Sequence, residues 1–113
     1  LPPSPAKFIL YFQPSSDQLT VESALMIGQV AAAIRQRVNP DVSIAGHTDT
    51  VGSAEANVKL STERAKTVAG LIAAKGIDTS GYQIVSHGKN NPLVATGDGV
   101  AEPRNRRVEV IVR

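Results

Sequence analysis

The feature that most constrains the fold is an alternation of short β-prone runs with two long helical patterns. Apolar or β-branched runs predict strands at residues 7–12, 41–45, 82–86 and 107–112. A helical pattern follows each of the first two runs, whereas the last two runs are joined by a long loop at residues 87–106. Strands linked through a helix favour parallel pairing. The order therefore predicts an α/β two-layer sandwich, with two main helices packed on a four-stranded mixed sheet (βαβαββ).

The first helix is expected to begin after Thr20, a suitable N-cap, with Glu22 in the first turn where the helix dipole favours a negative charge. It is expected to end at Asn39-Pro40, since a residue before proline avoids the helical conformation. The residues that recur at helical spacing, and so form its predicted core face, are Val21, Ala24, Leu25, Gly28, Ala31, Ile34 and Val38.

The second helix is expected over residues 54–75, capped by Ser53 and stopped by Gly76. A helical wheel assigns its core face to Val58, Ala65, Val68, Ala69 and Ile72, and its solvent face to Lys59, Glu63 and Lys66. Asn57 and Arg64 share a third stripe beside the core face, flanked by Leu60 and Ser61. Such a stripe would follow the groove edge where helix meets sheet, and the loop 46–53 leads into the same helix. We therefore expect Asp49 and Arg64 to converge on one pocket, where an acid and a base would suit a zwitterion.

Length and composition indicate one globular domain. The 113 residues are 42% hydrophobic and 19% charged, and no apolar run approaches the roughly 20 residues that cross a bilayer. The chain starts with Leu1-Pro2-Pro3-Ser4-Pro5, which is typical of the end of a linker. We expect residues 1–5 to be linker and residues 6–113 to be the domain, within a longer or processed protein.

Several function classes are disfavoured by the residues present. The net charge of +2 and the four aromatic residues (two Phe, two Tyr) argue against nucleic-acid binding. The absence of cysteine excludes disulfides and Cys-based metal sites. His47 and His87 have no third ligand at motif spacing, and Ser61 has no histidine at nucleophile spacing, so no metal, cofactor or hydrolytic activity is expected.

Two separated motifs resemble a known family. The segment GHTDTVGSAEANVKLSTERA at residues 46–65 and the segment NRRVEV at residues 105–110 resemble the OmpA-like C-terminal (peptidoglycan-binding) domain. That family is shared by outer-membrane protein A, peptidoglycan-associated lipoproteins and flagellar stator proteins. The resemblance extends over nearly the whole chain and also includes Tyr11-Phe12, Gly88 and Pro92.

The resemblance implies non-covalent, non-enzymatic binding of peptidoglycan through the meso-diaminopimelate residue of its peptide stem. Carried over by position, Asp49 would take the diaminopimelate ammonium and Arg64 its carboxylate, for which a planar guanidinium is suited. The other implied ligand-binding residues are Val51, Gly52, Asn57, Phe12 and Arg106. The implied location is the periplasm of a Gram-negative bacterium, in a protein tethered to the outer membrane while this domain itself is not membrane-inserted.

Departures from the family pattern affect the rim of the expected groove. Gln13 stands where an acid is common, and Pro14-Ser15-Ser16 replaces a more polar run. Lys89 stands where Glu is common, and Pro103 where glycine is common. The first-loop contacts are therefore the least secure part of the implied site.

Other interpretations of the same residues stay open. Asp49 alone could satisfy loop amides, and Asn57 could be only a hydrogen-bonding residue at the helix start. His47 beside Asp49 could serve an enzyme that trims the wall. The chain could also be a protein-interaction module of an envelope complex whose wall-binding groove is vestigial.

Overall fold

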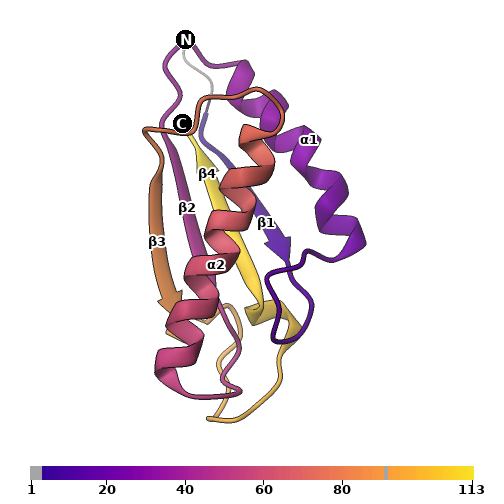
Figure 1. Ribbon diagram of the computed structural model, residues 1–113, viewed down its shortest axis with the longest axis vertical. Helices are drawn as coiled ribbons and strands as arrows, with labels where there is room; N and C mark the ends of the chain where they lie inside the picture. Colours follow the sequence, from indigo (N-terminus) through magenta and orange to yellow (C-terminus); the bar gives the residue numbers. More distant parts are fainter. Residues whose placement is uncertain (1–3, 91) are drawn as a thin grey trace.

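The computed structural model describes residues 4–90 and 92–113, and it has two layers, with both helices on one face of a single sheet (Figure 1). The elements in chain order are β1 (Ala6–Tyr11), α1 (Val21–Arg35), β2 (Val42–His47), α2 (Ala54–Ala73), β3 (Gln83–Gly88), the 3-10 turn η1 (Pro103–Asn105) and β4 (Arg107–Val112). The predicted two-layer α/β sandwich with a four-stranded mixed sheet is confirmed.

The last strand of the chain lies inside the sheet. The strand order is β1-β4-β2-β3, and β4 pairs antiparallel with both β1 and β2. Val110 of β4 stands opposite Phe8 of β1 and Ile44 of β2. The strands β2 and β3 pair in parallel and are connected through α2, as expected for a strand–helix–strand unit. The sheet is complete only when the C-terminal strand has been inserted.

The core fills the space between the helices and one face of the sheet. Alternate residues of the central strands face it, because side chains of a strand point to opposite faces in turn. The fully covered side chains that form its centre are Leu10, Val30, Val42, Ile44, Ala65, Val68, Ile72, Val108, Val110 and Val112.

The predicted core face of α1 is wrong in part. Val21, Leu25 and Val38 are 71%, 77% and 94% exposed, and Val38 lies beyond the helix, which ends at Arg35. The face that is buried instead consists of Ser23, Ile27, Val30, Ala31 and Ile34. Apolar residues surround most of this helix, so their spacing alone does not select the buried side.

The predicted orientation of α2 is also wrong in part. Val58 is 45% exposed, whereas Asn57 and Arg64 are buried. A close approach of backbones sets this rotation, because a Cβ atom on Gly46 of β2 would lie 1.9 Å from the carbonyl oxygen of Ser61. The stripe predicted to follow the groove edge therefore faces the sheet and its loops.

Two further expectations concern the ends of the chain and membranes. Residues 1–3 of the expected linker 1–5 lie outside the described residues. Within the described part of the chain, no helix combines the length and the apolar character that crossing a membrane requires.

Candidate functional site

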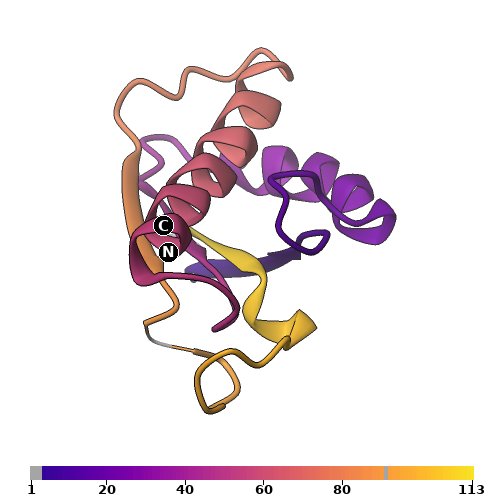
Figure 2. The same cartoon turned by 60° about the horizontal axis from the view of Figure 1, so that its bottom comes forward.

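Three loops meet at one end of the sheet. The strands β1, β2 and β3 all end there and β4 begins there, so the segments that follow β1 and β2 gather with the long β3–β4 connection (lower end of Figure 1). Figure 2 brings this end forward and shows the loop that leads into α2, the turn η1 and the β1–α1 loop arranged around it. The residues predicted to bind a ligand lie in these loops or next to them.

Asp49 is held by donors from two of the loops. Its Oδ2 atom accepts a hydrogen bond from Nη1 of Arg106 at 3.0 Å and one from the amide of Glu102 at 3.4 Å. Its Oδ1 atom accepts one from the amide of Val51 at 3.3 Å. The side chains of Asp49 and Arg106 are only 10% and 12% exposed, so this ion pair has little contact with water and is weakened little by salt. Asp49 thus joins the β2–α2 loop to the start of β4.

Arg64 lies beneath the same loops and is 0% exposed. Its Nη1 atom donates to the carbonyl of His47 at 2.9 Å, which anchors the end of β2. Its Nε and Nη2 atoms donate to the carbonyls of Ser16 at 2.8 Å and Gln13 at 3.2 Å, in the β1–α1 loop. Its guanidinium also lies over the ring of Phe12, 5.2 Å from the ring centre, which is within range of a cation–π interaction.

Burial and neighbouring charges act on Arg64 in opposite directions. The net effect lowers the pKa of Arg64 to about 10: burial is the largest cause, the nearby Asp49 carboxylate opposes it, and the Arg106 cation adds to it. Arg64 therefore stays protonated at neutral pH although it is enclosed. No carboxylate forms an ion pair with Arg64 within the described residues, so this cation is stabilised by hydrogen bonds to backbone carbonyls and by the field of Asp49.

The loop that carries Asp49 is fastened at several points. Asn57 of α2 donates from its side-chain amide to the carbonyl of Val51 at 3.0 Å. Gly52 adopts φ +90, a conformation that favours glycine. Ser53 caps α2 by accepting a hydrogen bond from the amide of Ala56. The loop therefore enters the helix in a defined conformation.

Thr50 ties this loop to the β3–β4 connection, a role that the sequence analysis missed. Its hydroxyl accepts a hydrogen bond from the amide of Val100 at 2.9 Å and lies 2.7 Å from the carbonyl of Gly97, to which it donates. Its backbone carbonyl accepts from the amide of Gly99. Partners about 50 positions away leave no local pattern, so nothing in the sequence singles out Thr50.

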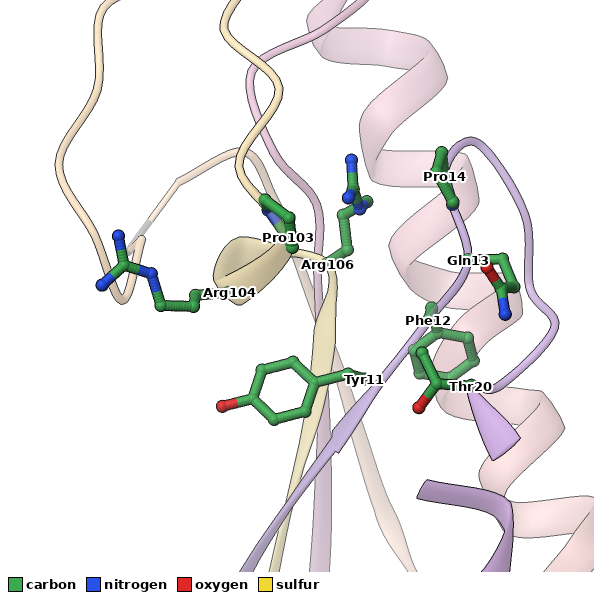
Figure 3. A pocket seen from close by; sticks show the side chains of 8 residues that line it. All are labelled: Tyr11, Phe12, Gln13, Pro14, Thr20, Pro103, Arg104 and Arg106. Atoms are coloured by element: carbon green, nitrogen blue, oxygen red, sulfur yellow. The ribbon is translucent and has the colours of Figure 1, made fainter. Parts of the chain in front are cut away.

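A pocket of about 320 Å³ opens next to this cluster (Figure 3). It is bounded on one side by the end of β1 and its loop, and on the other by η1 and the residue that follows it. Its lining residues are Tyr11, Phe12, Gln13, Pro14, Thr20, Pro103, Arg104 and Arg106. Of these, sequence reasoning named only Phe12 and Arg106 as ligand-binding residues. The prolines and Tyr11 form a wall only because β1 and β4 are neighbours in the sheet.

His47 belongs to a different cluster from Asp49. Its ring stacks on His87 with 4.8 Å between ring centres, and its Nε2 atom lies 3.7 Å from a carboxylate oxygen of Glu109. Burial, followed by the charge of Arg107, lowers the pKa of His47 to about 4, so the imidazole is neutral at neutral pH. The structure gives it no contact with Asp49. Within the described residues, no group of three or more His, Cys, Asp or Glu side chains could hold a metal ion.

Arg106 follows the turn η1 and directly precedes β4, whereas Arg107 is the first residue of β4. Arg106 pairs with Asp49, whereas Arg107 pairs with Glu109 at 2.6 Å. Neither side chain is solvated, because side-chain exposure is 12% for Arg106 and 3% for Arg107.

Comparison with known proteins identifies relatives of this chain by sequence. The chain is 38% identical over 97 residues to a peptidoglycan-associated lipoprotein of Legionella pneumophila. This alignment covers 84% of this chain and 55% of that protein. It is 33% identical over 87 residues to the peptidoglycan-binding protein ArfA of Mycobacterium tuberculosis, covering 77% of this chain and 27% of ArfA. The chain thus spans about half the length, or less, of these relatives.

Solved structures agree with the fold. The crystal structure of the peptidoglycan-associated lipoprotein from Burkholderia pseudomallei matches with a TM-score of 0.82 at 25% identity, over 93% of this chain and 89% of that one. The C-terminal domain of Helicobacter pylori MotB matches with a TM-score of 0.80 at 21% identity, over 94% and 84%, which is a likeness of fold alone. The OmpA family profile matches residues 11–106, which carry both the loops and the helix described above. The chain therefore belongs to the OmpA family.

Proposed function

We propose that this domain binds peptidoglycan non-covalently through the meso-diaminopimelate residue of the peptide stem, and so anchors an envelope protein to the cell wall. The observation that carries the proposal is the cluster of Asp49, Arg64 and Arg106 at the end of the sheet. The names of two relatives, a peptidoglycan-associated lipoprotein and a peptidoglycan-binding protein, support it.

Asp49 has capacity for one more donor. An ionised carboxylate offers about four lone-pair positions, and three are taken by Val51, Glu102 and Arg106. The remaining position would accept the ammonium of the diaminopimelate side chain. The ligand would then share Asp49 with Arg106 and would not need to displace it.

Arg64 would bind the carboxylate of the same zwitterion. A guanidinium has five N–H donors, and three are used within the described residues, which leaves one on each Nη atom. A carboxylate can pair with two such donors at once. Main-chain amides near Val51 and Gly52, at the start of α2, would add donors to the same carboxylate, while Phe12 and Asn57 would keep Arg64 and the loop in place.

Access to Arg64 requires a movement of the β1–α1 loop. Arg64 is fully covered, and the carbonyls of Gln13 and Ser16 lie against its guanidinium. Between them Ser15 has φ 50, which is uncommon for a residue other than glycine and raises the energy of this conformation. A displacement of this loop that uncovers the two remaining Nη donors would admit the ligand carboxylate. Binding is therefore expected to change the amide environment of residues 13–18 as well as that of Asp49.

The proposed chemistry discriminates between wall types. A stem with lysine in place of diaminopimelate keeps the ammonium but lacks the side-chain carboxylate, so the opened Arg64 would have no anionic partner. An unsatisfied buried group costs about 1–3 kcal/mol, and more when it is charged, which corresponds to tenfold or greater selectivity.

The decisive test is an NMR titration with a meso-diaminopimelate muropeptide and with its lysine analogue. We expect shifts at Asp49, Val51 and Arg64 with the first ligand only. The Asp49→Asn variant should lose this response, while Asp98→Asn, the same change at a side chain that is 86% exposed, should keep it. Arg64→Ala is less informative alone, because Arg64 also binds three backbone carbonyls and its loss could unfold the domain. The thermal unfolding of the Arg64→Ala variant must therefore be measured in parallel.

Other outcomes would redirect the assignment. If neither muropeptide shifts any resonance, the groove is vestigial and the domain is better tested as a protein-interaction module. Release of soluble fragments from purified sacculi would favour an enzyme instead. We place the parent protein in the periplasm, tethered to the outer membrane, and co-sedimentation of the domain with sacculi from a Gram-negative bacterium tests the wall attachment this requires.

A further inference from the structure

The outer side of α1 is apolar and uncovered. Its exposed residues, which we call the α1 outer face, are Val21, Ala24, Leu25, Gly28 and Ala32. Leu25 and Val21 are 77% and 71% exposed, and α1 lies at the margin of the molecule in both views (Figure 1 and Figure 2). All of these residues except Ala32 belong to the core face that the sequence pattern predicts. The helix therefore carries a second core-like face that its own fold does not cover.

Charge is confined to the two ends of this helix. No charged residue occurs at residues 23–34, whereas Glu22 lies in the first turn and Arg35 in the last. A helix that is apolar on all sides is normally buried, because an uncharged surface of this kind is poorly solvated. A partner that fits this face is apolar along its middle, with a cation at the level of Glu22 and an anion at the level of Arg35.

A second, antiparallel copy of α1 meets these requirements. The midpoint between Glu22 and Arg35 falls between positions 28 and 29. A two-fold axis at this point brings each Glu22 to the level of Arg35 in the second copy. The same axis brings Leu25 to the level of Ala32 in the second copy, so a large side chain meets a small one. The two helix dipoles also run in opposite directions in this arrangement, which is favourable.

Gly28 leaves room for a close approach beside that axis. A Cβ atom added to Gly28 would meet nothing within 4 Å. The distance between packed helices is set by the side chains at the contact, and small residues shorten it. The apolar surface also continues onto α2, where Leu71 is 38% exposed. A hollow of about 280 Å³ joins the two helices, and its lining residues are Ala24, Ile27, Leu71, Ala74 and Lys75.

We propose that the α1 outer face is a homodimer interface, in which two copies of α1 cross antiparallel about a two-fold axis beside Gly28. A two-fold interface uses the same patch on both copies, which requires a self-complementary patch of this kind. The Asp49 cluster lies at the end of the sheet and not on this face, so both sites of a dimer stay accessible. If the proposed function holds, one dimer would grip two peptide stems, and the second attachment would gain from effective concentration.

The dimer is expected to be weak, because one helix and the edge of a second offer less than the roughly 800 Å² per partner of a standard interface. A dissociation constant on the order of 100 µM is expected for so small an interface. Sedimentation velocity on either side of that concentration should show monomer turning into dimer. Leu25→Asp would bury a charge without a partner and should weaken association at least tenfold. Val38→Asp is the matched control, since Val38 is 94% exposed and lies beyond α1.

A charge exchange tests the pairing of the helix ends. Glu22→Arg and Arg35→Glu should each weaken the dimer several-fold, because each change places like charges at both ends of the interface. An equimolar mixture of the two variants should associate again, because every new charge then meets an opposite one. Arg35 also donates to the carbonyl of Lys75, so the Tm of each variant is measured alongside. Recovery in the mixture cannot arise from a folding defect.

Introduced thiols locate the two-fold axis. The chain has no cysteine, so a single new thiol can form a disulfide only with its copy in a second molecule. Gly28→Cys lies beside the axis and should give a disulfide dimer on mild oxidation, since the two α-carbons must come within about 7 Å. Val38→Cys lies away from the face and reports chance collisions, so it should crosslink much more slowly.

The outcomes decide between self-association and other partners. A domain that remains monomeric at ten times the expected dissociation constant would overturn the proposal and leave the face to an apolar helix of a different protein. Equal crosslinking of the two thiols, or no recovery in the mixed variants, would overturn the antiparallel arrangement. None of these measurements uses a wall ligand, so failure of the dimer leaves the proposed function standing, and failure of muropeptide binding leaves the dimer standing.

Discussion

Replacing Gly46 with alanine should disrupt the packing that positions the whole site. Gly46 of β2 faces α2, and an added Cβ atom would lie 1.9 Å from the carbonyl oxygen of Ser61 and 2.7 Å from its carbonyl carbon. Ordinary contact begins at about 3.4 Å, so the helix backbone would have to retreat by about 1.5 Å. A side chain could rotate away from such an overlap, but the backbone inside a helix cannot.

The energetic consequence follows from what α2 buries. Its inner face presents Ala65, Val68 and Ile72 to the core, all at 0% exposure. A gap of 0.5–1 Å already loses about a quarter to a half of the dispersion attraction between facing atoms. Overpacking costs about 1–3 kcal/mol, and a backbone overlap belongs at or above the upper end. About 3 kcal/mol corresponds to a fall in Tm on the order of 12 °C for a domain of this size.

Thermal unfolding followed by circular dichroism measures this effect directly. Gly70→Ala is the matched control, since Gly70 lies in α2 with nothing within 4 Å of the added Cβ. It should raise stability by about 0.5–1 kcal/mol, because alanine loses less backbone entropy in a helix. A Gly46→Ala protein that melts within about 2 °C of the wild type would refute the packing argument.

Three further changes have defined outcomes. Thr50→Val removes the hydroxyl that binds the backbone of Gly97 and Val100, which should cost about 1–3 kcal/mol and speed amide exchange at Val100. Asn57→Ala releases the carbonyl of Val51 and should lower stability by about 1 kcal/mol in denaturant unfolding, with shifts at the Val51 and Gly52 amides; unchanged spectra would contradict this. The last change concerns pH. Because burial lowers the pKa of His47 to about 4, the unfolded chain takes up the proton first, so the contribution of His47 is complete above pH 6.5 and is lost as pH falls towards 4. That loss amounts to at most about 3 kcal/mol, and His47→Gln should show a flatter stability profile between pH 6.5 and 4.5.

The sequence alone determined the order of the elements and most of their limits. The strand expected at residues 107–112 matches β4, and the helix expected at residues 54–75 matches α2 to within two residues. These elements depend on local signals: β-branched runs, an N-cap at Ser53 and a stop at Gly76. The motif around Asp49 and the terminal strand also indicated the family, which the match over residues 11–106 establishes.

Tertiary structure decided which side of each helix is buried and what Arg64 contacts. Apolar residues occur on several sides of both helices, so their spacing permitted the wrong rotation, with Val58 in the core and Arg64 at a groove edge. The absence of a Cβ atom at Gly46 allows α2 to approach the sheet, and this contact turns Arg64 inward onto three carbonyls. Such contacts join positions from 17 to 51 residues apart. No local pattern encodes them, because they exist only after the sheet has closed around its last strand.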